Sequence, residues 1–182
     1  MFEAWMPMLQ AVPGSVLWLM RSSQLAQGNL RRAAEGAGVD PRRLVFAGVL
    51  PKDEHFARHR VADLFLDTRI INAATIASDA LWAGLPVLTC PGETLGSRVA
   101  ASLVCAVGLE DLAVRDLAEC ARLGIDLARG PAKLAEVRAR LARNRLAMPL
   151  FDTRRFVANI ERAYEAMHAA DVCGEPARSF AL

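Results

Sequence analysis

The sequence predicts an α/β domain of the Rossmann-like, doubly wound type, and three observations lead to that prediction. Short apolar runs that suit buried strands alternate with longer stretches of helical periodicity. The connections between them are short, with Gly, Pro and Ser at the breaks. At 182 residues, the chain is long enough to bury one substantial core. We therefore expect parallel strands joined by helices, followed by a helical C-terminal segment.

The first part of the chain contains three expected helices and three expected strands. The apolar spacing of residues 2–9 predicts a helix with one buried face. Ser22 or Ser23 suits the N-terminus of a second helix, which ends before Gly38. The expected inner stripe of that helix is Leu30, Ala33, Ala34 and Ala37. A third helix is expected over 53–62, and strands are expected over 15–20, 44–47 and 64–66.

The stretch from Asp67 to Arg98 is the part around which the remaining elements are organised. Thr75 is the expected cap of a helix ending at Gly84, with Leu81 and Trp82 expected in the core. Residues 87–89 form the next expected strand, and another helix is expected to begin near Ser97. Two successive strand-to-helix crossings imply a parallel sheet. Ligands of such sheets bind beyond the carboxyl ends of the strands, where helix N-termini favour a phosphate.

The C-terminal part is expected to be helical. Residues 107–112 indicate a connector, and helices are expected over 117–129 and 131–147. Asp152 or Thr153 is the expected cap of a last helix. The apolar face of that helix consists of Phe156, Val157, Ile160, Ala163, Tyr164 and Met167.

Composition excludes several classes of function. The net charge is +2 and charges of both signs are interspersed, so no nucleic-acid partner is expected. The cysteines lack CxxC or other metal-ligand spacing, which favours reduced thiols and no metal site. They are Cys90, Cys105, Cys120 and Cys173. The most apolar early run, Val16 to Met20, is too short to span a bilayer, so we expect a cytoplasmic protein without a membrane partner.

Two ungapped runs carry a resemblance to a known family. They are residues 79–87 (DALWAGLPV) and 91–102 (PGETLGSRVAAS). Together they resemble the donor-binding lobe of the O-linked N-acetylglucosamine (O-GlcNAc) transferases and their bacterial tetratricopeptide-repeat relatives. Shorter matches occur at 16–19 (VLWL), 51–55 (PKDEH) and 149–153 (PLFDT). The resemblance covers nearly the whole chain.

The resemblance implies the C-terminal lobe of a GT-B glycosyltransferase. Residues 1–150 would form the nucleotide-sugar-binding lobe, 151–170 a C-terminal helix and 171–182 a tail. The implied reaction is an inverting transfer of a sugar, with N-acetylglucosamine expected, from a UDP-sugar to a Ser or Thr hydroxyl of a protein. It implies no metal or other cofactor. The protein acceptor would bind through an N-terminal lobe and repeats that this chain lacks.

The resemblance also implies a set of donor-binding residues. Lys52 and the amides at Thr75 would stabilise the UDP leaving group. His55 and Arg58 would face the uracil, and Asp79 the ribose. The full set is Leu50, Lys52, His55, Arg58, Ala74, Thr75, Ile76, Asp79, Glu93, Thr94, Ser97 and Arg98. Without the resemblance, each of these residues could instead have an ordinary structural role. Lys52 could be a solvated lysine and His55 a surface histidine. Asp79 could be a carboxylate favoured by a helix N-terminus, and Thr94 or Ser97 could cap a helix.

Two departures from the family pattern matter. The family has His-Thr-Thr at the start of the central helix, where this chain has Ala74-Thr75-Ile76. A lost hydrogen bond to a charged group costs about 1.5 to 3 kcal/mol, so donor affinity is expected to fall by at least tenfold. The family lobe also opens with a central strand that this chain lacks, which is expected to leave neighbouring strands without a shared partner. The chain is therefore expected to be a fragment of a larger enzyme.

Three functions remain open from the sequence. The leading one is the donor-binding half of a protein O-glycosyltransferase. The second is a non-catalytic nucleotide-sugar-binding or interaction module, which the changes at Ala74 and Ile76 favour. The third is a related UDP-sugar enzyme, such as an epimerase or a small-molecule glycosyltransferase.

Overall fold

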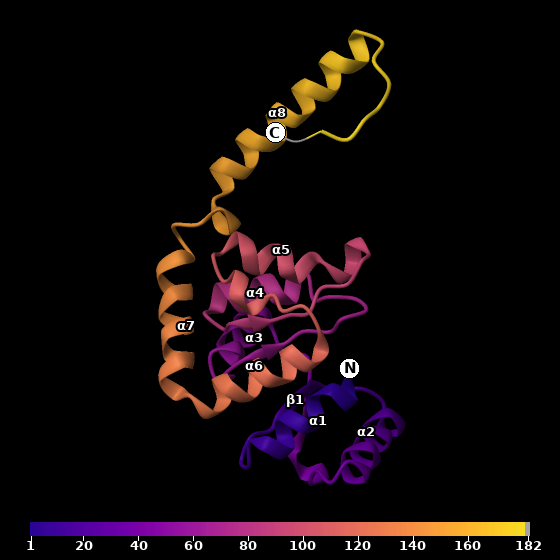
Figure 1. Ribbon diagram of the computed structural model, residues 1–182, viewed down its shortest axis with the longest axis vertical. Helices are drawn as coiled ribbons and strands as arrows, with labels where there is room; N and C mark the ends of the chain where they lie inside the picture. Colours follow the sequence, from indigo (N-terminus) through magenta and orange to yellow (C-terminus); the bar gives the residue numbers. More distant parts are fainter. Residues whose placement is uncertain (181–182) are drawn as a thin grey trace.

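The computed structural model describes residues 1–180, in which strands and helices alternate along the first half of the chain (Figure 1). The strands are β1 (Leu17–Met20), β2 (Leu44–Ala47), β3 (Phe65–Leu66) and β4 (Val87–Leu88). The helices are α1 (Phe2–Ala11), α2 (Gln24–Gly36), α3 (Lys52–His59), α4 (Thr75–Ala83), α5 (Val99–Ala106), α6 (Leu117–Arg129), α7 (Pro131–Asn144) and α8 (Thr153–Val172). Short 3-10 turns cover Pro41–Arg43, Leu95–Ser97, Glu110–Leu112 and Pro149–Phe151. The predicted α/β fold class is confirmed.

The strands form two parallel pairs. β1 pairs with β2, Leu17 opposite Leu44, and β3 pairs with β4, Phe65 opposite Val87. A parallel bridge between Thr89 and Ala113 continues the second pair. Within residues 1–180, no strand hydrogen-bonds to both pairs, so the predicted parallel sheet is divided in two.

Two apolar clusters hold these pairs to the helices. One cluster contains Leu81 of α4, Val104 of α5 and Leu141 of α7, all fully buried. The other joins α1 to both strand pairs through Trp5, Leu17 and Leu88. α6 contributes to both clusters and packs along α1. The molecule therefore has a continuous core despite its divided sheet.

Polar side chains cap α2 and α8 at the positions predicted from the sequence. Ser23 Oγ accepts from the Ala26 N–H at 3.2 Å and caps α2, while Asp152 accepts from the Arg155 N–H at 3.0 Å and caps α8. α4 ends at Gly84 with a φ of +89°, a left-handed conformation that favours glycine. These caps satisfy amides and carbonyls that have no partner within the helix.

Three local predictions were wrong. Thr75 is the first residue of α4 rather than its cap, and Ala74 precedes it without a side-chain cap. Ala33 is exposed, and only Ala34 of α2 is fully buried, because α2 packs against the body through a narrow strip. Trp82 is 45% exposed. Its ring packs edge-on against Phe151 with a centroid separation of 5.1 Å instead of entering the core.

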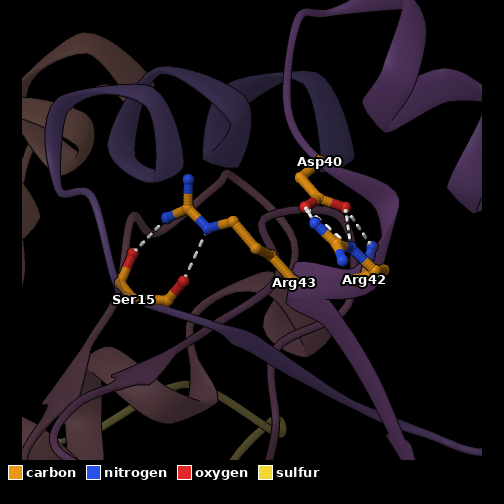
Figure 2. A network of polar contacts seen from close by, with 4 residues as sticks. All are labelled: Ser15, Asp40, Arg42 and Arg43. Atoms are coloured by element: carbon orange, nitrogen blue, oxygen red, sulfur yellow. Dashed lines mark hydrogen bonds and ion pairs between the residues drawn. The ribbon is translucent and has the colours of Figure 1, made fainter.

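An arginine pair orders the loops at the N-terminal ends of β1 and β2, as Figure 2 shows. Arg43 donates from Nε to the Ser15 carbonyl at 2.7 Å and from Nη2 to the Ser15 hydroxyl at 2.8 Å. Asp40 accepts from the backbone N–H and the guanidinium of Arg42. These hydrogen bonds hold the pKa of the Asp40 carboxyl below its usual value. The network lies at the opposite ends of the strands from the candidate site.

α8 projects away from the rest of the molecule (Figure 1). It has no fully buried residue, and its predicted apolar face is largely open, with Phe156 64% and Tyr164 61% exposed. The helix runs two residues past its expected end at Ala170, and residues 181–182 of the predicted tail lie outside the described part. Among the helices of residues 1–180, none combines the length and the apolarity that a bilayer span requires.

Candidate functional site

The predicted nucleotide contacts on α3 and α4 lie on two helices that pack against each other. Leu50 and Lys52 are exposed at the start of α3, and the Lys52 ammonium lies over the Phe56 ring, 5.8 Å from its centroid. Asp79 of α4 is near enough to His55 of α3 for its charge to act on the imidazole. The fold therefore brings together groups that are separated by more than twenty residues in the sequence.

Arg58 sets the state of the His55 ring. Arg58 Nη2 lies 2.7 Å from His55 Nδ1, and Arg58 Nη1 donates to the Gly48 carbonyl at 2.7 Å. Because a guanidinium can only donate, His55 Nδ1 accepts and the ring proton sits on Nε2. Burial lowers the pKa of His55, and electrostatic interactions with His59 and Arg58 lower it further. The charge of Asp79 acts in the opposite direction, but the net shift of the pKa is downward and favours the neutral imidazole. In that form His55 can donate from Nε2 to a carbonyl oxygen.

The start of α4 offers backbone donors rather than charged side chains. Ala74, Thr75 and Ile76 are exposed there, and the first bond of the helix runs from the Ser78 N–H to the Ala74 carbonyl. The amides before Ser78 have no carbonyl partner within the helix. Such amides and the positive end of the helix dipole favour an anion. Thr75 is the one residue of the three with a hydrogen-bonding side chain.

The second predicted cluster lies on the loop between β4 and α5. Ser97 is buried, and its Oγ accepts from the Thr94 N–H at 3.0 Å, which is the capping arrangement left open by the sequence. Gly92 donates to the Ser97 carbonyl at 2.8 Å, and a Cβ at Gly92 would lie 2.6 Å from Ser97 Oγ. Glu93, Thr94 and Arg98 face solvent. Ser97 therefore serves the loop, and the Thr94 hydroxyl lies 3.0 Å from Ser97 Oγ within the same cap. The exposed side chains of Glu93 and Arg98 can contact a ligand.

A backbone hydrogen bond joins this loop to the loop before α4. Asn72 donates its N–H to the Gly96 carbonyl at 2.8 Å. The two loops, one from each predicted polar cluster, are consequently neighbours at the carboxyl ends of β3 and β4. Beside them is an open hollow that includes Glu93, Arg98 and Ser102.

Sequence reasoning missed two features. Asp67, directly after β3, is only 3% exposed and accepts hydrogen bonds from Thr89, which follows β4, and from Ala73 in the loop before α4. Its one sequence signal is an acidic residue directly after an apolar strand. A second open hollow lies where β1 and β2 end, lined by Arg21, Ser22, Gln24, Gln27, Arg31 and Phe46. Its residues come from segments that no single motif connects.

Within residues 1–180, no group of His, Cys, Asp and Glu side chains has the arrangement of a metal site. The four cysteines are free thiols, with Cys90 and Cys120 buried and Cys105 and Cys173 exposed. Burial raises the pKa of Cys120 to about 11, which keeps it protonated at neutral pH.

The parallel strand pairs, with helix N-termini and two joined loops at their carboxyl ends, define a Rossmann-like α/β lobe with room for an anionic ligand. Residues 1–160 match the family model of Glycosyl transferase family 41. The chain therefore belongs to this glycosyltransferase family.

Three similar proteins show how closely the chain matches members of known sequence or structure. The chain is 38% identical over 179 residues to the probable UDP-N-acetylglucosamine–peptide N-acetylglucosaminyltransferase SEC of Arabidopsis thaliana, covering 98% of this chain and 18% of the relative. It is 35% identical over 159 residues to UDP-N-acetylglucosamine–peptide N-acetylglucosaminyltransferase of Caenorhabditis elegans, covering 87% of this chain and 14% of the relative. A mutant O-GlcNAc transferase from Thermobaculum terrenum matches in structure with a TM-score of 0.85 and 31% identity. That match covers 91% of this chain and 32% of the solved chain. The chain thus spans a fifth or less of these curated relatives.

Proposed function

We propose that this chain is the donor-binding part of a protein O-glycosyltransferase, which transfers a sugar from a UDP-sugar to a Ser or Thr hydroxyl. N-acetylglucosamine is the sugar we expect, because the names of both curated relatives specify it. The observation that carries the proposal is the pair of hydrogen-bonded loops beside the open amides of α4, in a chain of family 41. We place the protein in the cytoplasm and expect the acceptor to bind elsewhere on the complete polypeptide.

Each group has a task that follows from its chemistry. The neutral His55 donates from Nε2 to a carbonyl of the base, and the Asp79 carboxylate accepts from ribose hydroxyls. The α4 amides and the Thr75 hydroxyl hold the diphosphate. During transfer, negative charge grows on the departing UDP, and preorganised amides together with the Lys52 ammonium stabilise it.

The chain offers a matched pair for testing Lys52, because its only two lysines are Lys52 and Lys133. Lys133 lies on α7, 3.9 Å from the Asp126 carboxylate. We expect Lys52→Ala to weaken UDP binding by about tenfold or more, the scale of a lost charge-assisted hydrogen bond. Lys133→Ala is expected to leave the affinity unchanged. Isothermal titration calorimetry of the folded chain, checked by thermal melting, measures both; equal affinities for all three proteins would remove Lys52 from the site.

A second candidate function is a nucleotide-sugar-binding module without catalytic activity. The apolar side chains at Ala74 and Ile76 favour it, because they leave Thr75 as the sole side-chain donor at the start of α4. Sugar transfer by the polypeptide that contains both lobes would support the enzyme. Tight binding of UDP-N-acetylglucosamine by that polypeptide, with no transfer to protein, would support the module.

Restoring a hydroxyl tests the cost of the apolar replacements. Ile76 is 38% exposed, so Ile76→Thr places a donor at the first turn of α4 without emptying the core. We expect UDP affinity to rise by roughly threefold to tenfold, the scale of one added hydrogen bond to a charged group. Ile76→Val, which removes one methylene without adding a donor, is the control. A gain in both variants would assign the effect to size rather than hydrogen bonding.

A further inference from the structure

Asp67 is a buried carboxylate that joins three segments at the carboxyl end of β3. Its Oδ2 accepts from the Thr89 hydroxyl at 2.7 Å, and its Oδ1 accepts from the Ala73 N–H at 2.8 Å. Its own N–H donates to the Leu88 carbonyl at 3.0 Å. The residue is 3% exposed, so these bonds form away from bulk water. One side chain therefore links β3, the segment after β4 and the loop that leads into α4.

The loop after Asp67 has little apolar packing to hold it in place. Ile70 and Ile71 are 81% and 71% exposed at its tip. Asn72 is held by hydrogen bonds to the Thr68 and Gly96 carbonyls, both of which belong to loops. The bond from Ala73 to Asp67 ties this loop to a strand end through a buried side chain. It forms one residue before Ala74, where the open amides begin.

We propose that Asp67 is a positioning residue, which holds the amides at the start of α4 in the geometry that receives the diphosphate of a nucleotide-sugar. This inference rests on the proposed function for its ligand, but adds a residue and a role to it. Asp67 does not contact the ligand itself, because both of its carboxylate oxygens are directed to protein donors. A buried negative charge near a diphosphate would oppose binding, so the contribution of Asp67 comes from hydrogen-bond geometry and not from charge.

That distinction selects the variants. In Asp67→Asn, the amide oxygen can accept from Ala73, and the amide nitrogen can donate to the Thr89 hydroxyl, which is also an acceptor. Asp67→Ala removes both bonds. We expect Asp67→Ala to weaken binding of UDP-N-acetylglucosamine by about tenfold or more, and Asp67→Asn to remain within about threefold of the unmodified chain. Asp171→Ala, a change on the exposed part of α8, is the matched control.

Calorimetric titration separates positioning from simple stability. A purely structural role would lower the melting temperature and the number of binding sites per chain, yet leave the dissociation constant of the folded fraction unchanged. That result would overturn the proposal. Equal weakening in the Ala and Asn variants would also overturn it, because charge and not geometry would then be responsible. If Asp67→Ala does not fold, Thr89→Val, which removes one bond, is compared with Thr89→Ser, which keeps it; equal affinities in that pair contradict the proposal.

Hydrogen exchange tests whether Asp67 holds the loop before α4 in place, even if the chain fails to bind the nucleotide-sugar. Absence of binding by the unmodified, folded chain would refute the proposed function. The positioning of the loop would still be tested by the ligand-free exchange rates of the amides of residues 73–76. Faster exchange there in Asp67→Ala, with no comparable change in α6 or in Asp67→Asn, supports the anchoring role. Unchanged exchange at 73–76 refutes it.

Discussion

At the scale of single residues, the candidate site depends on groups that act through their neighbours. His55 acquires a defined tautomer because Arg58 occupies its Nδ1, and Arg58 is itself fixed by the Gly48 carbonyl. Asp67 similarly acts through the amide of Ala73. In both cases, the anchoring residue and the group that it orients lie on the same short segment. Substitutions at Arg58 and Asp67 should therefore alter binding without removing a ligand contact.

The titration of Asp67 gives a prediction about stability. Burial raises the pKa of the Asp67 carboxyl in the folded chain, although its hydrogen bonds from Ala73 and Thr89 act in the opposite direction. Above pH about 4, the unfolded chain ionises Asp67 first and the folded chain retains the proton longer. The contribution of Asp67 to the free energy of unfolding is therefore greatest at acid pH, and is lost as the pH rises through the folded pKa.

Asp67→Asn removes this titration. We expect the free energy of unfolding of the unmodified chain, minus that of the Asn variant, to decrease as the pH is raised from about 4 towards neutrality. Urea unfolding at a series of pH values measures the difference, and groups common to both proteins cancel. A difference that stays constant over this range would show that Asp67 titrates normally in the fold.

At the scale of elements, α4 begins at the open amides of the first candidate cluster, and the loop before it is hydrogen-bonded to the loop of the second cluster. Its N-terminus faces the candidate anion site, and its C-terminus closes at Gly84 in the left-handed region. Leu81 of α4 is fully buried, whereas Trp82 lies outside against Phe151 and Arg145. The orientation of the open amides is therefore fixed by core packing on one side of the helix and by a left-handed ending.

Substitutions at two glycines test the importance of the left-handed conformation at the end of α4. Gly84→Ala forces a Cβ into a conformation with φ of +89° and is expected to destabilise the fold by about 1–2 kcal/mol. Gly28→Ala, within α2 and with no atom beyond the neighbouring backbone of the helix within 4 Å of the added Cβ, is expected to stabilise it by about 0.5–1 kcal/mol. Chemical denaturation measures both changes. A stable Gly84→Ala protein would mean that the turn after α4 has an alternative conformation.

At the scale of the whole molecule, α6 joins the two apolar clusters. Leu127 of α6 belongs to the cluster around α4, and Cys120 belongs to the cluster around α1. Leu123, between them in sequence, packs against both. Gly124 lies against Met8 so closely that an added Cβ would be 3.1 Å from the sulfur atom. This shared helix packs against both strand pairs, which have no hydrogen-bonded strand in common within residues 1–180.

A cooperative transition is therefore expected. Trp5 reports on the α1 cluster, and Trp82 reports on the packing of α4 against Phe151. We expect thermal or urea transitions followed by either tryptophan, with the other two replaced by Phe, to coincide. Leu123→Ala is expected to lower both midpoints together, by about 2–4 kcal/mol in stability. Transitions that separate would show that the two clusters unfold independently.

Much of the fold was predictable because it depends on local sequence patterns. The apolar spacing of α1, the Ser and Asp caps of α2 and α8, and the breaks before β4 and α7 each depend on a few adjacent residues. The ends of β3 and β4 were less well defined, because each pairs over only two residues. The prediction that Trp82 lies in the core was wrong for a different reason. Helical periodicity indicates which side of a helix a side chain is on, but it does not show that Trp82 packs against Phe151 and Arg145 instead of entering the core.

By itself, the sequence determined the α/β class and the family resemblance, and it predicted which residues make up the two candidate polar clusters, since all three depend on residues close together in the chain. The tertiary structure alone decided that the strands form two pairs and that Ser97 hydrogen-bonds within its own loop. It alone revealed Asp67 as the link between Ala73 and Thr89. The physical reason is the same throughout. Burial, hydrogen-bond partners and strand pairing are relations between distant segments, and they exist only once the chain has folded.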